Sequence, residues 1–132
     1  MSLSPSPLMQ AFFLFQEVAK EGFDWDSPFA AARKVKEELE EVLEELNKPG
    51  PSQQQALKEE IGDLFLACSC LARHCHVEPD EAIRSGLKKF MSRYQCLKDY
   101  VNEKGISLEE ASATLLSTYW QELKKKDFSN KD

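Results

Sequence analysis

Apolar side chains recur every three or four residues along three long stretches of the chain. An α-helix turns once in about 3.6 residues, so this spacing places the apolar side chains on one face of a helix. The apolar positions are Val35, Leu39, Val42 and Leu46 in the first stretch, Leu57, Ile61, Leu64, Cys68, Leu71 and Cys75 in the second, and Ile83, Leu87, Phe90, Tyr94, Leu97 and Val101 in the third. No stretch alternates apolar and polar residues over the length of a strand, so the pattern predicts an all-α protein.

Turn-forming residues divide the chain into five predicted helices. Gly22 ends the first helix, and Pro28 and Pro79 each stand at a first helical position. Ser52 and Ser107 each lie three residues before a Gln or Glu, which is the capping-box pattern of a helix start. The predicted helices cover residues 8–21, 28–46, 52–75, 79–104 and 107–126. Because short connections favour antiparallel neighbours, we expect an antiparallel bundle of four to five helices.

The size and charge of the chain narrow its class. A chain of 132 residues suits one domain, and we expect residues 1–132 to form it, with a flexible leader at 1–7 and a flexible tail at 127–132. The net charge of −6 argues against a nucleic-acid partner, which usually needs a basic face. No apolar run approaches the length of a membrane span, and the first apolar stretch lacks the features of a signal peptide. We therefore expect a cytoplasmic protein with no membrane partner.

Two of the predicted helices each carry a pair of carboxylates on one flank of the apolar stripe. These are Glu38 and Glu41 on one helix, and Glu60 and Asp63 on the next. Antiparallel pairing places both pairs of carboxylates on the same side of the two helices and at similar distances from the connecting loop. Four close carboxylates take up protons or need a cation, and oxygen ligands favour Mg²⁺, with Mn²⁺ as an alternative. An ordinary solvated acidic face explains the same residues equally well.

Other metals have less support in the sequence. A di-iron bundle usually adds a histidine three residues after a glutamate, and no histidine follows these glutamates in that way. Cys68, Cys70 and Cys75 match no standard zinc spacing. Cys68 and Cys75 fall on the apolar stripe, where a thiol packs as a small hydrophobe.

Positive charge and aromatic rings occur where a nucleotide could use them. Lys89 and Arg93 lie one turn apart on one flank of the fourth predicted helix. With Lys34 they offer three cations to a polyphosphate, although the positions of the charges alone favour an ordinary basic surface. Trp25 in a loop could stack on a base, whereas packing explains Trp120 in the fifth helix at least as well.

The carboxylates stand in Glu37-Glu38-Leu39-Glu40-Glu41 and in Glu60-Ile61-Gly62-Asp63. This arrangement resembles the MazG family of nucleoside triphosphate pyrophosphohydrolases, which shows Glu-Glu-x-x-Glu followed by Glu-x-x-Asp. The flanking stretches that are similar to the family are Gly-Phe-Asp-Trp at 22–25, Lys-Val at 34–35, Leu-Ala-Arg-His at 71–74, Lys-Phe at 89–90, Glu-Lys-Gly at 103–105 and Tyr-Trp-Gln at 119–121. The resemblance covers about residues 14–125.

The resemblance implies a MazG-like bundle, usually completed by dimerisation, that hydrolyses a nucleoside triphosphate to the monophosphate and pyrophosphate. The metal ligands that it implies for Mg²⁺ are Glu38, Glu41, Glu60 and Asp63. Glu37 and Glu59 would bind a further metal or orient the attacking water. The implied phosphate contacts are Lys34, Lys89 and Arg93. Clearing non-canonical nucleotides is an expectation for the family as a whole.

Two other functions stay open from the sequence. One is a non-catalytic helical module that binds a nucleotide or a protein, and the carboxylate set argues against it. The other is a specialised relative that hydrolyses a nucleotide such as phosphoribosyl-ATP, and the Phe-Asp-Trp stretch at 23–25 argues against that.

Overall fold

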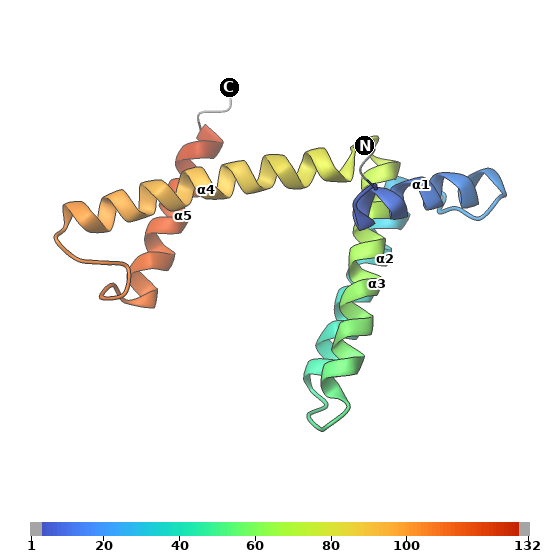
Figure 1. Ribbon diagram of the computed structural model, residues 1–132, viewed down its shortest axis with the longest axis horizontal. Helices are drawn as coiled ribbons and strands as arrows, with labels where there is room; N and C mark the ends of the chain where they lie inside the picture. The colour runs from blue at the N-terminus through green and yellow to red at the C-terminus, as the bar shows by residue number, and fades with distance from the viewer. Residues whose placement is uncertain (1–3, 130–132) are drawn as a thin grey trace. The chain divides into compact units, whose positions relative to one another are not determined.

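The computed structural model describes residues 4–129, and helices make up most of this range (Figure 1). The helices are α1 (Pro7–Lys20), α2 (Pro28–Leu46), α3 (Gln53–His74), α4 (Pro79–Glu103) and α5 (Ala113–Ser129). No strand occurs within the described residues. The all-α fold class predicted from the apolar spacing is therefore confirmed. Parts of the predicted leader and tail, residues 1–3 and 130–132, lie outside the described range.

The first two helices begin where serine and proline stand together. Ser6 Oγ accepts the backbone N–H of Met9 at 3.2 Å, and α1 starts at Pro7. Ser27 Oγ accepts the backbone N–H of Ala30 at 3.1 Å, and α2 starts at the proline that follows. Each serine accepts a backbone N–H that the first turn of a helix leaves unpaired, while proline has no backbone N–H to leave unpaired there.

Ser52 is the N-cap of α3, as predicted, but the capping-box bond expected from its side chain is absent, and Ser107 does not begin a helix. Ser52 makes no side-chain cap bond; instead Gln53 Nε2 donates to the carbonyl oxygen of Glu45 at 3.1 Å, at the end of α2. Ser107 Oγ accepts the backbone N–H of Glu110 at 3.2 Å, but this closes only a turn. The fifth helix begins six residues later than predicted, at Ala113 rather than Ser107, because Ser112 supplies the cap that the helix uses.

The described residues form two compact units, the first ending at Ile83 and the second beginning at Arg84. In the first unit α2 and α3 lie side by side and antiparallel, and α1 packs against α3 (Figure 1). Ser69, which is fully buried, donates to the carbonyl oxygen of Leu8 at 2.9 Å and so ties α3 to α1. The buried apolar side chains of this unit are Ala11, Ala31, Val42, Ala67 and Cys70. This arrangement holds the flanks of α2 and α3 in a fixed register.

The second unit contains most of α4 together with α5. Leu97 and Val101 of α4 are buried. The rings of Phe90 and Trp120 have their centroids 4.9 Å apart, so Trp120 packs against α4 within this unit. The prediction that all 132 residues form a single domain stays a prediction.

The apolar stripe of α2 is only partly covered. Val42 is buried, as the stripe predicts, but Leu39 is 45% exposed and Leu46 is 53% exposed. On α3, Ile61 and Phe65 are exposed as well. Cys68 and Cys75 are also exposed, so the prediction that they pack as small hydrophobes is wrong. None of the described helices combines the length and the apolar character that crossing a bilayer requires.

Candidate functional site

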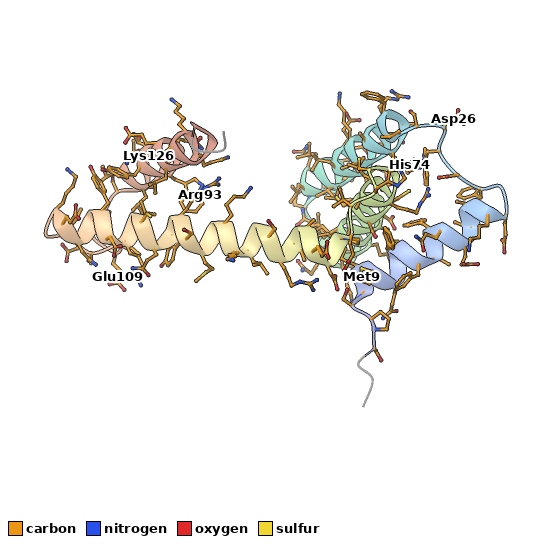
Figure 2. The ribbon with its side chains drawn as sticks, turned by 90° about the horizontal axis from the view of Figure 1, so that it is seen from above. Met9, Asp26, His74, Arg93, Glu109 and Lys126 are labelled. Atoms are coloured by element: carbon orange, nitrogen blue, oxygen red, sulfur yellow. The ribbon has the colours of Figure 1, made fainter. Side chains whose placement is uncertain are left out.

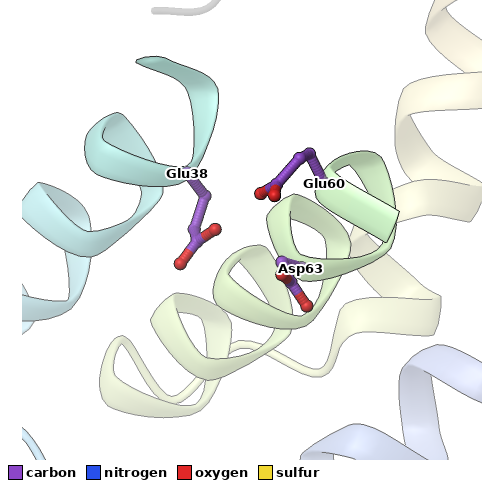
Figure 3. A group of neighbouring side chains, drawn as sticks. All are labelled: Glu38, Glu60 and Asp63. Carbon is purple, nitrogen blue, oxygen red and sulfur yellow. The ribbon is translucent and has the colours of Figure 1, made fainter. Parts of the chain in front are cut away.

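Three carboxylates from α2 and α3 point toward one another in the first unit (Figure 3). Glu38 comes from α2, while Glu60 and Asp63 come from successive turns of α3. One oxygen from each lies within 4.8 Å of the others, and within the described part of the chain these three form the group that could hold a metal ion. The antiparallel pairing places them together because each lies on the flank of its helix that faces the partner helix.

The burial of the carboxylates tests whether a cation fits between them. Glu38 is only 7% exposed, and Glu60 is half-buried. The Oε2 atoms of both residues are buried and have no hydrogen-bond partner among the described residues. A buried carboxylate oxygen without a partner is costly, and a hard divalent cation would satisfy both oxygens at once. These three side chains therefore fit a bound metal ion.

Glu41 lies at the edge of this group. Its carboxyl shares a hydrogen bond with that of Glu60, and this bond is the main cause of a raised pKa at Glu60. Burial and the charges of Glu41, Asp63 and Glu38 add to it, so the pKa of Glu60 is raised to about 6. Close carboxylates resist ionising together unless a cation joins them. The structure thus brings all four predicted metal ligands near one another, and their roles as ligands stay predictions.

Lys34 supplies positive charge beside the carboxylates. Its Nζ lies 2.9 Å from Glu38 Oε1 and 3.7 Å from Glu37 Oε2. The hydrogen bond to Glu38 is the largest cause of a raised pKa at Lys34, so this amine stays charged. Glu37 and Glu59, the two further carboxylates implied by the resemblance, are both exposed. Lys34 therefore lies close enough to the carboxylates to reach a phosphate bound beside them.

The other two predicted phosphate contacts lie in the second unit. Lys89 is exposed and Arg93 is half-buried, and both belong to α4. The carboxylates belong to the first unit, so the contacts of Lys89 and Arg93 with a phosphate stay predictions.

A pocket of about 150 Å³ opens beside Lys34, Glu38 and Asp63. Trp25, from the loop between α1 and α2, lines it. The apolar residues that complete the lining, which the sequence reasoning did not single out, are Phe15, Leu66, Ala67 and Cys70. The α3 members of this set could have been found, because they follow Asp63 by three, four and seven residues and so share its helix face. Phe15 of α1 gave no such signal.

The raised pKa of Glu60 predicts how stability depends on pH when no metal is present. The ordinary pKa of a glutamate is 4.5, and in the folded protein that of Glu60 is about 6. The folded state therefore binds more protons than the unfolded state in this range, so the contribution of Glu60 to stability is full below pH 4.5 and is lost as the pH rises through about 6. We expect the free energy of unfolding in EDTA to fall over this window relative to Glu60→Gln. Urea unfolding of both proteins at several pH values measures the difference, and parallel pH curves would contradict the prediction.

Comparison with known proteins shows which protein family the chain matches. Residues 26–97 match the MazG nucleotide pyrophosphohydrolase domain. The chain is 34% identical over 123 residues to the nucleoside triphosphate pyrophosphohydrolase/pyrophosphatase MazG of Thermotoga maritima, covering 90% of this chain and 46% of that protein. It is 30% identical over 120 residues to the nucleoside triphosphate pyrophosphohydrolase of Escherichia coli K12, covering 91% of this chain and 45% of that protein. The chain thus spans about half the length of these curated relatives.

Proposed function

The chain belongs to the MazG family, and from that premise we propose that it hydrolyses nucleoside triphosphates to the monophosphate and pyrophosphate with Mg²⁺ as its metal. One observation carries the proposal most directly. Glu38, Glu60 and Asp63 converge within 4.8 Å, and two of their buried oxygens have no partner among the described residues. An all-oxygen ligand set of this kind suits a hard cation such as Mg²⁺, with Mn²⁺ as the alternative.

In the proposed reaction a water oxygen bonds to the α-phosphorus as the bond from that phosphorus to the α–β bridging oxygen breaks. Glu38, Glu60 and Asp63 would hold the cation, with Glu41 as the fourth ligand. When bound, Mg²⁺ offsets the charge of the phosphate oxygens and acidifies a coordinated water. Glu37 or Glu59, which are both exposed, would orient the attacking water. No covalent intermediate with the protein is needed.

Lys34 is the cation best placed to stabilise the departing pyrophosphate. Its amine already lies beside Glu38 and stays charged, so no reorganisation is needed when negative charge develops nearby. Lys89 and Arg93 are the further phosphate contacts proposed from the family resemblance.

The base is proposed to enter the pocket beside the carboxylates. Trp25 and the apolar side chains of Phe15 and Leu66 offer flat and apolar surface, while Lys34 and Asp63 stand on the side of the metal ligands. Stacking on an aromatic ring accepts any base, so this pocket agrees with a role in clearing several non-canonical nucleotides.

A homodimer is the proposed assembly. Leu39, Leu43 and Leu46 along α2 are between 45% and 53% exposed, and apolar surface of this kind is typical of an interface. A second copy would complete the bundle, and light scattering after gel filtration measures the mass.

The cytoplasm, which holds the nucleotide pool, is the proposed location.

Pyrophosphate release decides among the candidate functions. The test uses a panel of ordinary and damaged nucleoside triphosphates together with phosphoribosyl-ATP, each with Mg²⁺ and again with EDTA. We expect release from one or more of the triphosphates with Mg²⁺ and none with EDTA. Turnover of phosphoribosyl-ATP alone would favour the specialised relative, and no turnover at high protein concentration would favour the non-catalytic module.

A further inference from the structure

One oxygen of Asp24 gathers three polar contacts in the loop between α1 and α2. Asp24 Oδ1 accepts the backbone N–H of Trp25 at 2.8 Å. It also accepts from Arg73 Nη2, and His74 Nε2 lies 2.8 Å from it. Arg73 and His74 are at the C-terminal end of α3, where Figure 2 labels His74, and they follow Asp24 by 49 and 50 residues. We call Asp24, Arg73 and His74 the loop anchor.

The loop anchor acts directly on the residue that lines the pocket. The bond from the backbone of Trp25 restrains the torsion angles next to its side chain, and the bonds to α3 hold the loop against a rigid helix. The ring of Phe23 also lies near Trp25, with the two ring centroids 6.1 Å apart, but Phe23 is itself 70% exposed. The loop anchor thus ties this loop to α3 through side-chain contacts.

One face of α3 connects the loop anchor with the carboxylates. Asp63 and Cys70 of α3 line the pocket, and Arg73 and His74 follow on the next turn of the same face. The Arg73 guanidinium also hydrogen-bonds the Cys70 thiol, whose pKa burial raises. Two of the proposed metal ligands, Glu60 and Asp63, therefore belong to the same rigid helix as Cys70 in the pocket lining and the attachment point of the loop.

The charges support a persistent contact. The side chains of Arg73 and His74 are only 15% and 10% exposed, so water competes weakly for Asp24 on that side. Burial alone would raise the pKa of Asp24, but the hydrogen bonds from Trp25 and His74 and the positive charge of Arg73 lower it overall. Asp24 therefore stays ionised at neutral pH and keeps its attraction for Arg73.

We propose that Arg73 and His74, acting through Asp24, are positioning residues that hold Trp25 as a preformed wall of the base pocket. Neither residue belongs to the carboxylate group that would hold the metal, so in this proposal they govern the binding of the base rather than the chemical step. The part of this inference that concerns the base rests on the proposed function, whereas the placement of Trp25 does not.

Tryptophan fluorescence tests the placement without any substrate. The chain has two tryptophans, so Trp120→Phe leaves Trp25 as the only tryptophan, and excitation at a wavelength that tyrosine does not absorb reports on Trp25 alone. In that background we expect Asp24→Asn and Arg73→Gln each to move the emission to longer wavelength and to increase quenching by acrylamide. Lys20→Gln, which removes an exposed cation from a surface ion pair on α1, should change neither signal.

Kinetics test the consequence for binding. We expect Asp24→Asn and Arg73→Gln to raise the KM for a nucleoside triphosphate about tenfold, the effect of losing one base–aromatic stack, and to leave kcat nearly unchanged. Inhibition by inorganic tripolyphosphate, which has no base, should stay the same. Arg73→Lys keeps the charge beside Asp24 and should restore part of the KM.

The outcomes separate the inference from the proposed function. Unchanged Trp25 emission and quenching in both variants would overturn the positioning role, whatever the kinetics show. A fall in kcat at constant KM would overturn it too, because that is the result of a purely structural defect. If the wild-type protein hydrolyses no nucleotide, the proposed function fails, and the fluorescence of Trp25 alone decides the placement. Should Arg73→Gln fail to fold, Asp24→Asn tests the same contact from the more exposed side.

Discussion

Asp63→Asn and Glu60→Gln are each expected to lower kcat/KM for nucleoside triphosphates by more than about a hundredfold. Residues that only support metal ligands cost about ten- to a hundredfold when replaced, and a ligand itself should cost more. Both changes keep the shape of the side chain and remove the negative charge that would hold Mg²⁺. Pyrophosphate release at saturating Mg²⁺ measures the loss.

The fold should survive both substitutions. The three carboxylates that converge are not held by one another but by α2 and α3, and removing one charge relieves repulsion when no metal is present. Circular dichroism should therefore stay helical, and the melting temperature in EDTA should not fall. Glu44→Gln is the matched control, because Glu44 is an exposed glutamate of α2 outside the group. Near-normal activity in Asp63→Asn would remove Asp63 from the ligand set.

The carboxylate group was predictable because helix geometry is regular. The positions of Glu38, Glu60 and Asp63 relative to the apolar stripes follow from counting residues, and a short connection makes the two helices antiparallel. In the structure one oxygen of each of these three side chains lies within 4.8 Å of the other two, as that expectation requires. The burial of Glu38 was not predictable, since it depends on how closely the helices approach.

The loop anchor had no comparable signal in the sequence. Asp24 lies 49 residues from Arg73, and a loop has no periodic pattern that predicts which helix end it will reach. Arg73 and His74 were noted only as part of a stretch similar to the family. The start of α5 was mispredicted for a related reason: Ser107 and Ser112 both fit a helix cap, and only the path of the chain selects the second.

Lys34→Met is expected to change catalysis and metal binding in opposite directions. Without the amine, the departing pyrophosphate loses a preorganised positive charge, and kcat should fall about a hundredfold, as when one donor to a developing oxyanion is removed. The same amine neutralises Glu38 at 2.9 Å and Glu37 at 3.7 Å before a metal arrives. Its loss leaves the carboxylates more negative, so they should attract Mg²⁺ more strongly.

The size of the gain in metal affinity follows from the exposure of the pair. The Lys34 side chain is 38% exposed, so water screens its interaction with the carboxylates and the full Coulomb energy does not apply. We expect Mg²⁺ to bind about threefold to tenfold more tightly to Lys34→Met, and Mg²⁺ to raise the melting temperature of the variant more than that of the wild type. Titration calorimetry and thermal melts with increasing Mg²⁺ measure both.

A fall in kcat together with a rise in Mg²⁺ affinity would distinguish Lys34 from an ordinary surface lysine. Lys36→Met on the same helix removes an exposed cation outside the carboxylate group, so it should leave kcat and Mg²⁺ affinity close to the wild type. If Lys34→Met bound Mg²⁺ more weakly, Lys34 would be holding Glu38 in the geometry that the metal needs, and not merely neutralising it. If kcat were unchanged, the phosphate contact would have to come from another cation, and Lys89 and Arg93 would be the next residues to replace.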